Sequence, residues 1–301
     1  MKHFLYKVAL FVIFVIIFDC IVGNTSEYLR SHAKGGSTAN NYYIAESLED
    51  DIVIFGSSRA THHYIPDIIE DSLGLSCYNC GEEGNGIILA YGRYKMITDH
   101  HTPKLIIYEV TPEYDWMICD NSKFTRYLKP YCHYDEIYDL VISCSEKNEK
   151  FKLCSKMYRN NSSLLTYAVD NVVYRDNMKG YSPLYGTMNG SQNNSDAVES
   201  TFELDYFKLA LLNNMMADAK SLGIQMLFVV SPYYYKITPD NYYPIISLCE
   251  RNSVVFLDLS NIDGIMGNME VFNDAGHMNH KGATAYTIYL SNILNQISTT
   301  I

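Results

Sequence analysis

Basic residues and tryptophan are scarce in this sequence. Lys and Arg total 23 against 34 Asp and Glu, which gives a net charge of −11, and Trp occurs once. A phosphate backbone is bound chiefly by Lys and Arg, so we do not expect this acidic chain to bind nucleic acid. No sequence period of about 20–50 residues is present, which excludes a repeat array.

The sequence also has little that resembles a metal or redox centre. Among eight cysteines, only Cys77 and Cys80 form a CxxC pair. Zinc would need a second pair at comparable spacing, and a redox pair would stand at a helix start rather than after a strand-like segment. We interpret the two cysteines as core residues or a local disulfide, and we expect no cofactor. The pairs His62–His63 and His100–His101 are expected at the surface.

Apolar residues are abundant. Hydrophobic residues make up 48% of the 301, enough for a sizeable core, and 27 are Tyr. Tyrosine suits sugars and other half-polar ligands, but it also fills strands and cores, so its abundance leaves both interpretations open.

Residues 1–23 predict a membrane anchor. Lys2 and Lys7 precede an apolar stretch that reaches 19 residues, from Phe4 to Val22, if Lys7 snorkels and Asp19 lies at the far interface. The positive residues predict an N-terminus inside, which places the rest of the chain outside the cytoplasm. Two alternatives are a cleaved signal peptide, although no A-x-A site follows closely, and a buried first helix. The polar residues 24–45 predict a linker.

The remaining chain, residues 46–301, alternates strand and helix patterns. Apolar runs that predict strands lie at 51–55, 76–78, 104–110, 224–230 and 253–258. Helical patterns between them lie at about 86–99, 203–222, 240–251 and 281–297. Buried strands alternating with helices predict an α/β fold with a parallel sheet covered on both faces.

A stretch at about 114–200 interrupts this alternation. It carries helical patterns near 135–143 and 146–158 and ends in a loop-like region. It is too long for an ordinary connection, so we interpret it as an inserted cap or partner surface, or as an extension of the same domain.

The first segment with chemical potential is Phe55-Gly-Ser-Ser-Arg-Ala60, at the end of the first predicted strand. Ligands of open α/β sheets bind at the carboxyl ends of strands. A serine hydroxyl there would lie beside unbonded N–H groups at a helix start, which suits a nucleophile. The alternative is that Ser57 or Ser58 only caps the helix.

The second segment is Phe272-Asn-Asp-Ala-Gly-His-Met-Asn-His-Lys-Gly-Ala283. Asp274 and His277 are three residues apart, so one tight loop could bring the carboxylate to the imidazole and leave its other nitrogen to accept a serine proton. Asn279 is expected to cap the last helix. The alternatives are a packed loop histidine, or a metal site formed by Asp274, His277 and His280.

Together, FGSSR and D-x-x-H-x-N-x-x-G-A resemble the first and last blocks of the SGNH (GDSL-like) hydrolases, closest to the membrane-anchored branch with GSSR in place of GDS. That resemblance implies a flavodoxin-like α/β/α sandwich. It also implies acyl-ester chemistry on cell-envelope glycans by a triad of Ser58, His277 and Asp274.

The second block of the family resembles Tyr78-Asn-Cys-Gly-Glu-Glu-Gly84, which implies oxyanion donors at Ser58 and Gly84. The third block should supply an Asn after the strand that ends at Val110, but the chain reads Thr111-Pro-Glu-Tyr-Asp115. Asn79 or Asn85 could take its place, and Arg59 is a further candidate for binding an anionic substrate.

Three functions are compatible with these residues. The first is a membrane-anchored esterase that removes acyl groups from glycans or other esters. The second is an O-acyltransferase that works with a membrane protein partner, because the same triad serves either water or a sugar hydroxyl. The third is an inactive binding or assembly protein that retains the fold.

Overall fold

The computed structural model describes residues 1–160, 163–188, 203–236 and 239–298. The chain divides into two compact units. Met1–Ser47 and Asn121–Asp176 form the first, which we call the helical unit. Leu48–Asp120 and Asn177–Ile301 form the second, which we call the sheet unit.

The sheet unit is built on one parallel sheet with the strand order β2-β1-β3-β4-β5. This is the flavodoxin-like order. The chain first places β2 on one side of β1 and then crosses over to place β3, β4 and β5 on the other side. The strands are β1 Ile52–Phe55, β2 Cys77–Asn79, β3 Leu105–Glu109, β4 Gln225–Val230 and β5 Val255–Asp258. All five coincide with predicted strands to within two residues, and the predicted fold class is confirmed.

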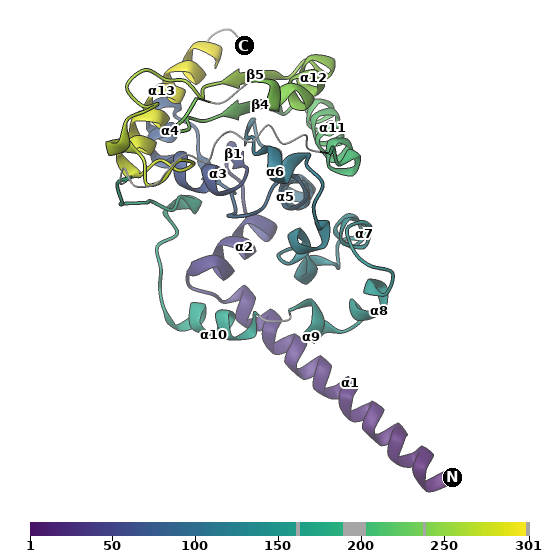
Figure 1. Ribbon diagram of the computed structural model, residues 1–301. Coiled ribbons are helices and arrows are strands. Elements are labelled where there is room, and N and C mark those ends of the chain that lie inside the picture. The colour runs from purple at the N-terminus through teal and green to yellow at the C-terminus, as the bar shows by residue number, and fades with distance from the viewer. Residues whose placement is uncertain (161–162, 189–202, 237–238, 299–301) are drawn as a thin grey trace. The chain divides into compact units, whose positions relative to one another are not determined.

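Helices cover both faces of the sheet (Figure 1). The helices of this unit are α3 Ser58–His63, α4 Pro66–Leu73, α5 Ile87–His100, α6 Pro112–Asp115, α11 Tyr206–Ser221, α12 Tyr243–Asn252 and α13 His280–Ser298. Short 3-10 helices lie at Met178–Gly180, Pro239–Tyr242 and Met269–Val271. Helix α13 packs with α3 and α4, and α11 packs with α5 and α12. The result is three layers.

The core lies between these layers because the central strands are apolar on both faces. Ile54, Ile107 and Val229 are buried in one cluster with Tyr286 and Leu290 of α13. The buried cysteines Cys77 and Cys80 are free thiols, so the core interpretation of that pair is confirmed and the disulfide alternative is not.

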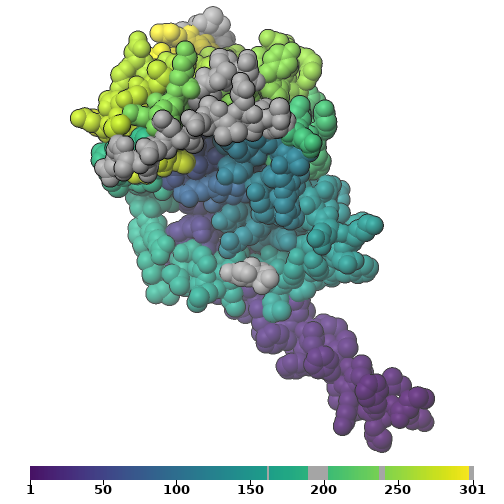
Figure 2. Space-filling view, in the orientation of Figure 1, coloured from purple at the N-terminus to yellow at the C-terminus, as the bar shows by residue number. Residues whose placement is uncertain are grey.

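The helical unit contains α1 Lys2–Ser31, α2 Gly36–Glu46, α7 Asp135–Ser143, α8 Glu149–Lys152, α9 Lys156–Arg159 and α10 Leu164–Val172. It also has 3-10 helices at Asn121–Thr125 and Lys129–Tyr131. Helix α1 is long and apolar enough to cross a membrane, and its most apolar stretch is not buried. Figure 2 shows this stretch extending from the rest of its unit.

The predicted helix at 146–158 is two helices instead. Ser155 lies between α8 and α9, and its hydroxyl accepts a hydrogen bond from the N–H of Tyr158. A serine in this position caps a new helix rather than continuing the old one.

The predicted linker at 24–45 is wrong, because most of it is helical. Helix α1 continues to Ser31 and α2 begins at Gly36. The N–H of Thr38, in the first turn of α2, donates to the Asp170 carboxylate, and the N–H of Lys34 donates to the Asp170 carbonyl. Polar composition suggested a linker, but these contacts to Asp170, 132 positions from Thr38, order the segment.

Candidate active site

The turn between β1 and α3 presents Ser58 at the carboxyl edge of the sheet. Gly56 has a φ of +143°, and a Cβ there would lie 2.6 Å from the carbonyl oxygen of Glu109. Only glycine fits this close approach of two strand ends. Ser57 occupies the N-cap position of α3 without a side-chain capping bond. Ser58 is the first residue of the helix, half-buried, with an N–H that has no acceptor within the helix.

The loop before α13 presents His277. The Asp274 carboxylate accepts hydrogen bonds from the N–H groups of Gly276 and His277, both at 2.9 Å, and so closes a tight turn. Asn279 caps α13 through a bond from the N–H of Gly282, as predicted. The Asn279 amide also donates to the carbonyls of Gly186 and Glu270, which fixes the loop.

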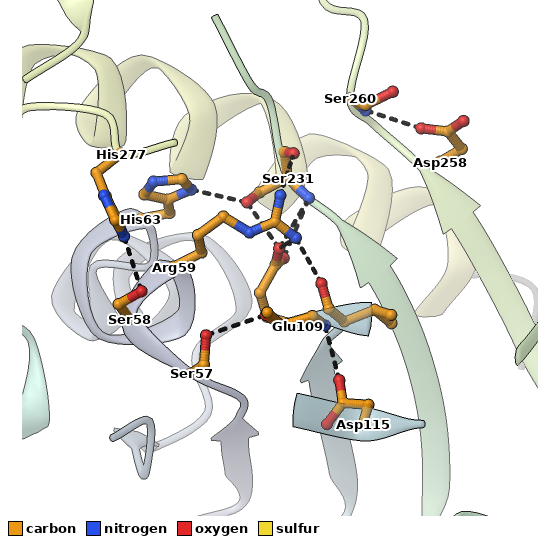
Figure 3. A network of polar contacts seen from close by, with 12 residues as sticks. Ser57, Ser58, Arg59, His63, Glu109, Asp115, Ser231, Asp258, Ser260 and His277 are labelled. Atoms are coloured by element: carbon orange, nitrogen blue, oxygen red, sulfur yellow. Dashed lines mark hydrogen bonds and ion pairs between the residues drawn. The ribbon is translucent and has the colours of Figure 1, made fainter. Parts of the chain in front are cut away.

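These two elements bring Ser58, His277 and Asp274 together. Ser58 Oγ lies 2.7 Å from His277 Nε2, although 219 positions separate them along the chain (Figure 3). On the other side of the ring, Nδ1 lies 2.9 and 3.1 Å from the two oxygens of Asp274. The side chains of His277 and Asp274 are 29% and 37% exposed, so the group is open to solvent.

The electrostatics of the group favour one proton arrangement. Partial burial raises the pKa of Asp274, but the His277 side chain and the N–H groups of Gly276 and His277 outweigh it and lower the pKa to about 2. The ionised carboxylate accepts the Nδ1 proton of His277, which leaves Nε2 as an acceptor for the hydroxyl of Ser58. This is the arrangement that activates a serine for attack on a carbonyl carbon.

A second histidine holds the loop in place, and sequence reasoning missed it. His62 and His63 were expected at the surface, yet they are 5% and 0% exposed because α3 packs against α13. The Nε2 of His63 accepts the N–H of Met278 at 2.9 Å, so its proton is on Nδ1, which donates to Ser231 Oγ at 2.7 Å. Burial and then the nearby Arg59 charge lower the pKa of His63 well below its usual range. His63 is therefore neutral.

Arg59 is not a substrate-binding residue, which corrects the sequence prediction. Its side chain is 3% exposed and forms an ion pair with Glu109 of β3. It also donates to the Val110 carbonyl and lies 3.8 Å from the centre of the Tyr233 ring. A carboxylate inside a buried strand needs a buried cation, so Glu109 within an apolar run was the signal that could have predicted this partner.

Glu109 joins the two parts of the site. Its carboxylate accepts bonds from the Ser231 hydroxyl and N–H and from the Tyr64 hydroxyl. Since Ser231 also accepts from His63, a continuous network connects Arg59 beside the serine to the loop that carries the histidine (Figure 3).

Asn79 is also wrong as a substrate-binding candidate. It is 1% exposed, and its amide nitrogen donates to the carbonyls of Ala60 and Tyr64 while its oxygen accepts the N–H of Gly81. Asn85 is half-buried and donates to the Glu83 carbonyl in its own turn.

Gly84 lies in an exposed turn with a φ of +65°, and a Cβ there would meet nothing within 4 Å. Among the described residues, the side-chain hydrogen bonds of Asn85 and Ser58 go to Glu83 and His277 and do not join the two. Their roles remain predictions.

A threonine occupies the strand end where the family would supply an asparagine. Thr111 Oγ1 lies 3.0 Å from the hydroxyl of Ser57, the residue before Ser58 (Figure 3). The buried Asp115 accepts the N–H groups of Thr111 and Ile87, and burial raises its pKa to about 7 against the hydrogen bonds that it accepts. Asp115 thus fixes the loop after β3 rather than facing Ser58.

Asp274, His277 and His280 do not come together as a metal site, which was the alternative interpretation of this segment. His280 Nδ1 lies 3.0 Å from the Tyr181 hydroxyl. Within the described ranges, no three His, Cys, Asp or Glu side chains gather closely enough to hold an ion.

Comparisons with known proteins give remote structural similarities. No family model matches it, and no curated protein matches it. A solved structure of a candidate acylhydrolase from Bacteroides fragilis is 12% identical, with a TM-score of 0.41, over 88% of this chain and 96% of that chain. A candidate lipolytic protein of the G-D-S-L family from Desulfitobacterium hafniense is 11% identical, with a TM-score of 0.39, over 81% and 99%. Likenesses this remote carry no argument about function, which must come from the site.

Breaking the buried ion pair should destabilise the sheet unit strongly. We expect Arg59→Met to cost about 3–5 kcal/mol, because it leaves the Glu109 carboxylate buried and unpaired. Denaturant unfolding followed by Trp116 fluorescence measures this, since that buried residue is the chain's one tryptophan. The matched control is Lys104→Met, whose ion pair with Asp51 is exposed and should contribute at most about 1 kcal/mol. Equal losses would contradict the prediction.

The low pKa of Asp274 should appear in the pH dependence of stability. Its contribution is fully present above the ordinary carboxyl pKa of about 3.9 and is lost only as the pH falls through about 2. We therefore expect the difference in Tm between wild type and Asp274→Asn to persist at pH 4 and to shrink below it. Thermal unfolding from pH 2 to 7 measures this, and a difference already gone at pH 5 would argue against the hydrogen-bonded turn.

Proposed function

We propose that this protein is a membrane-anchored SGNH-type serine esterase that acts outside the cytoplasm on acyl esters of glycans or envelope polymers, O-acetyl esters above all. One observation carries the enzymatic part of the proposal: Ser58 Oγ lies 2.7 Å from His277 Nε2, whose ring is held by Asp274 on its other side. The membrane part rests on helix α1, and the substrate class rests on the resemblance of FGSSR and its partner motif to the GSSR branch.

The residues perform the reaction in two steps. Ser58 Oγ attacks the ester carbonyl and its proton passes to His277 Nε2, while Asp274 stabilises the resulting imidazolium. The N–H groups of Ser58 and Gly84 stabilise the oxyanion. His277 then returns the proton to the departing sugar oxygen, which leaves an acyl group on Ser58.

The second step releases the acyl group. His277 takes a proton from a water molecule, whose oxygen attacks the acyl-serine carbonyl, and Ser58 departs with the proton that His277 gives back. A sugar hydroxyl in place of that water would give an O-acyltransferase with the same residues, so the acceptor alone distinguishes the two activities.

Ser58→Ala should abolish ester cleavage. We expect hydrolysis of a short acyl nitrophenyl ester to fall by at least about 10³-fold, because removal of one triad member leaves only binding and oxyanion stabilisation. A fluorophosphonate probe should label the wild type and not this variant. The control is Ser221→Ala, at the end of α11, which should keep both activity and labelling. Equal rates in Ser58→Ala and wild type would favour an inactive, fold-retaining protein.

The fate of the acyl group separates hydrolase from transferase. With an acetylated glycan and an unmodified glycan acceptor, we expect free acetate and no acetylated acceptor by mass spectrometry. Acceptor acetylation that depends on Ser58 would identify a transferase instead.

A further inference from the structure

The surface of the helical unit around helix α1 carries an apolar stripe without a protein partner among the described residues. On α10, Leu165, Val169 and Val172 are 78%, 39% and 82% exposed, and they lie at i, i+4 and i+7. Residues at that spacing share one face of a helix. Phe151 on α8 adds a side chain that is 80% exposed.

The opposite face of α10 is fixed to the base of α1 and to α2. Tyr167 and Asp170 are 7% and 2% exposed, and Asp170 holds the first turn of α2. The Asn171 amide donates to the Leu29 carbonyl of α1 at 2.6 Å. The apolar stripe of α10 therefore cannot turn inward without breaking this packing.

The length of the apolar part of α1 explains what covers the stripe. Fifteen residues from Phe4 to Phe18 span about 22 Å at about 1.5 Å each, which is short of a hydrocarbon core of about 30 Å. The missing length of roughly 8 Å corresponds to residues 19–23, in which Asp19 and Gly23 lie against Lys156 at the start of α9. A membrane that takes up the full span brings α9 and its neighbours to its surface, at the depth of about 5–10 Å typical of interfacial helices.

The hydrogen bonds of Asp19 suit a position at the edge of the membrane. A carboxylate at the edge of the hydrocarbon is costly unless its oxygens are satisfied. The N–H groups of Lys156 and Met157 donate to Asp19 at 3.0 and 3.1 Å, and the hydroxyl of Ser155 donates as well. The two bonds from N–H groups also cap α9, so the same contacts join α1 to the surface beside it.

The charges nearby match a lipid headgroup layer. Residues 146–159 contain five basic and two acidic residues, and the acidic Glu149 is buried in ion pairs with Lys129 and Lys152. Lys147 and Lys150 are exposed, and the Lys156 ammonium lies 2.9 Å from Asn24 Oδ1. Lysines beside an apolar stripe are typical of helices that lie on anionic membranes.

We propose that α8, α9 and α10 form a membrane-contacting surface, with Leu165, Val172 and Phe151 inserted at the bilayer interface around α1. The helical unit is then held flat on the membrane at several points rather than at one helix. The proposal does not depend on the esterase activity. Figure 1 shows α9 and α10 on either side of α1 where it leaves its unit, with α8 beyond α9.

Photo-crosslinking of the full chain tests this surface. The benzophenone amino acid p-benzoylphenylalanine would replace Leu165, or in separate variants Val172 or Phe151, in protein reconstituted into phosphatidylethanolamine–phosphatidylglycerol nanodiscs. We expect adducts with the mass of one phospholipid at each position, several-fold above the control. That control carries the label at Glu136, an exposed residue of α7 in the same unit.

The other occupants give distinct results. Adducts at twice the mass of the chain would show that a second copy covers the stripe, and either these or labelling no greater than at Glu136 would overturn the proposal. Three positions on two helices keep the result independent of one variant that fails to fold, and the unfolding profile of each labelled chain confirms its integrity.

Discussion

A carboxylate in the middle of the sheet sets the constraint on which the candidate site depends. Glu109 is fully buried on β3, and its position is tolerable only because Arg59, Tyr64 and Ser231 all direct donors at it. Arg59 directly follows Ser58, and Ser231 directly follows the neighbouring strand β4. The requirement to satisfy one buried charge thus fixes the helix that carries Ser58.

The same network extends to the loop that carries His277. His63 bonds to Ser231 through one ring nitrogen and to the backbone of Met278 through the other. Because neutral imidazole offers one donor and one acceptor, His63 fits between these groups in one tautomer only. The hydrogen bond between Ser58 and His277 joins the start of α3 to the loop before α13. Both are also connected below it, through the buried network of Arg59, Glu109, Ser231 and His63.

Much of this arrangement is legible from the sequence. Apolar runs predicted all five strands, three of which are followed closely by Gly56, Pro112 or Pro232, and the spacing of Asp274 and His277 predicted the contact between them. What sequence reasoning missed are side chains whose role depends on neighbours distant in the chain. Arg59 and Asn79 were candidates for substrate binding and His63 was expected at the surface, yet all three are buried and bonded within the protein.

The helical unit is harder to predict from sequence than the sheet unit, because its order comes from long-range contacts rather than from local pattern. Asp19 caps α9, Asp170 holds α2, and the Arg30 side chain lies 4.3 Å from the centre of the Tyr131 ring. Each of these pairs spans more than 100 residues, so a window-based reading of residues 24–45 sees only polar composition.

The bonds from Asp19 to the start of α9 have a consequence for how the chain could mature. A peptidase that removed the apolar leader beyond residue 19 would also remove the acceptor for three donors at the start of α9. The shortened chain would expose the surface of the unit that the removed part of α1 covers. Helix α1, which is long and apolar enough to cross a membrane, is therefore also a structural element of its unit.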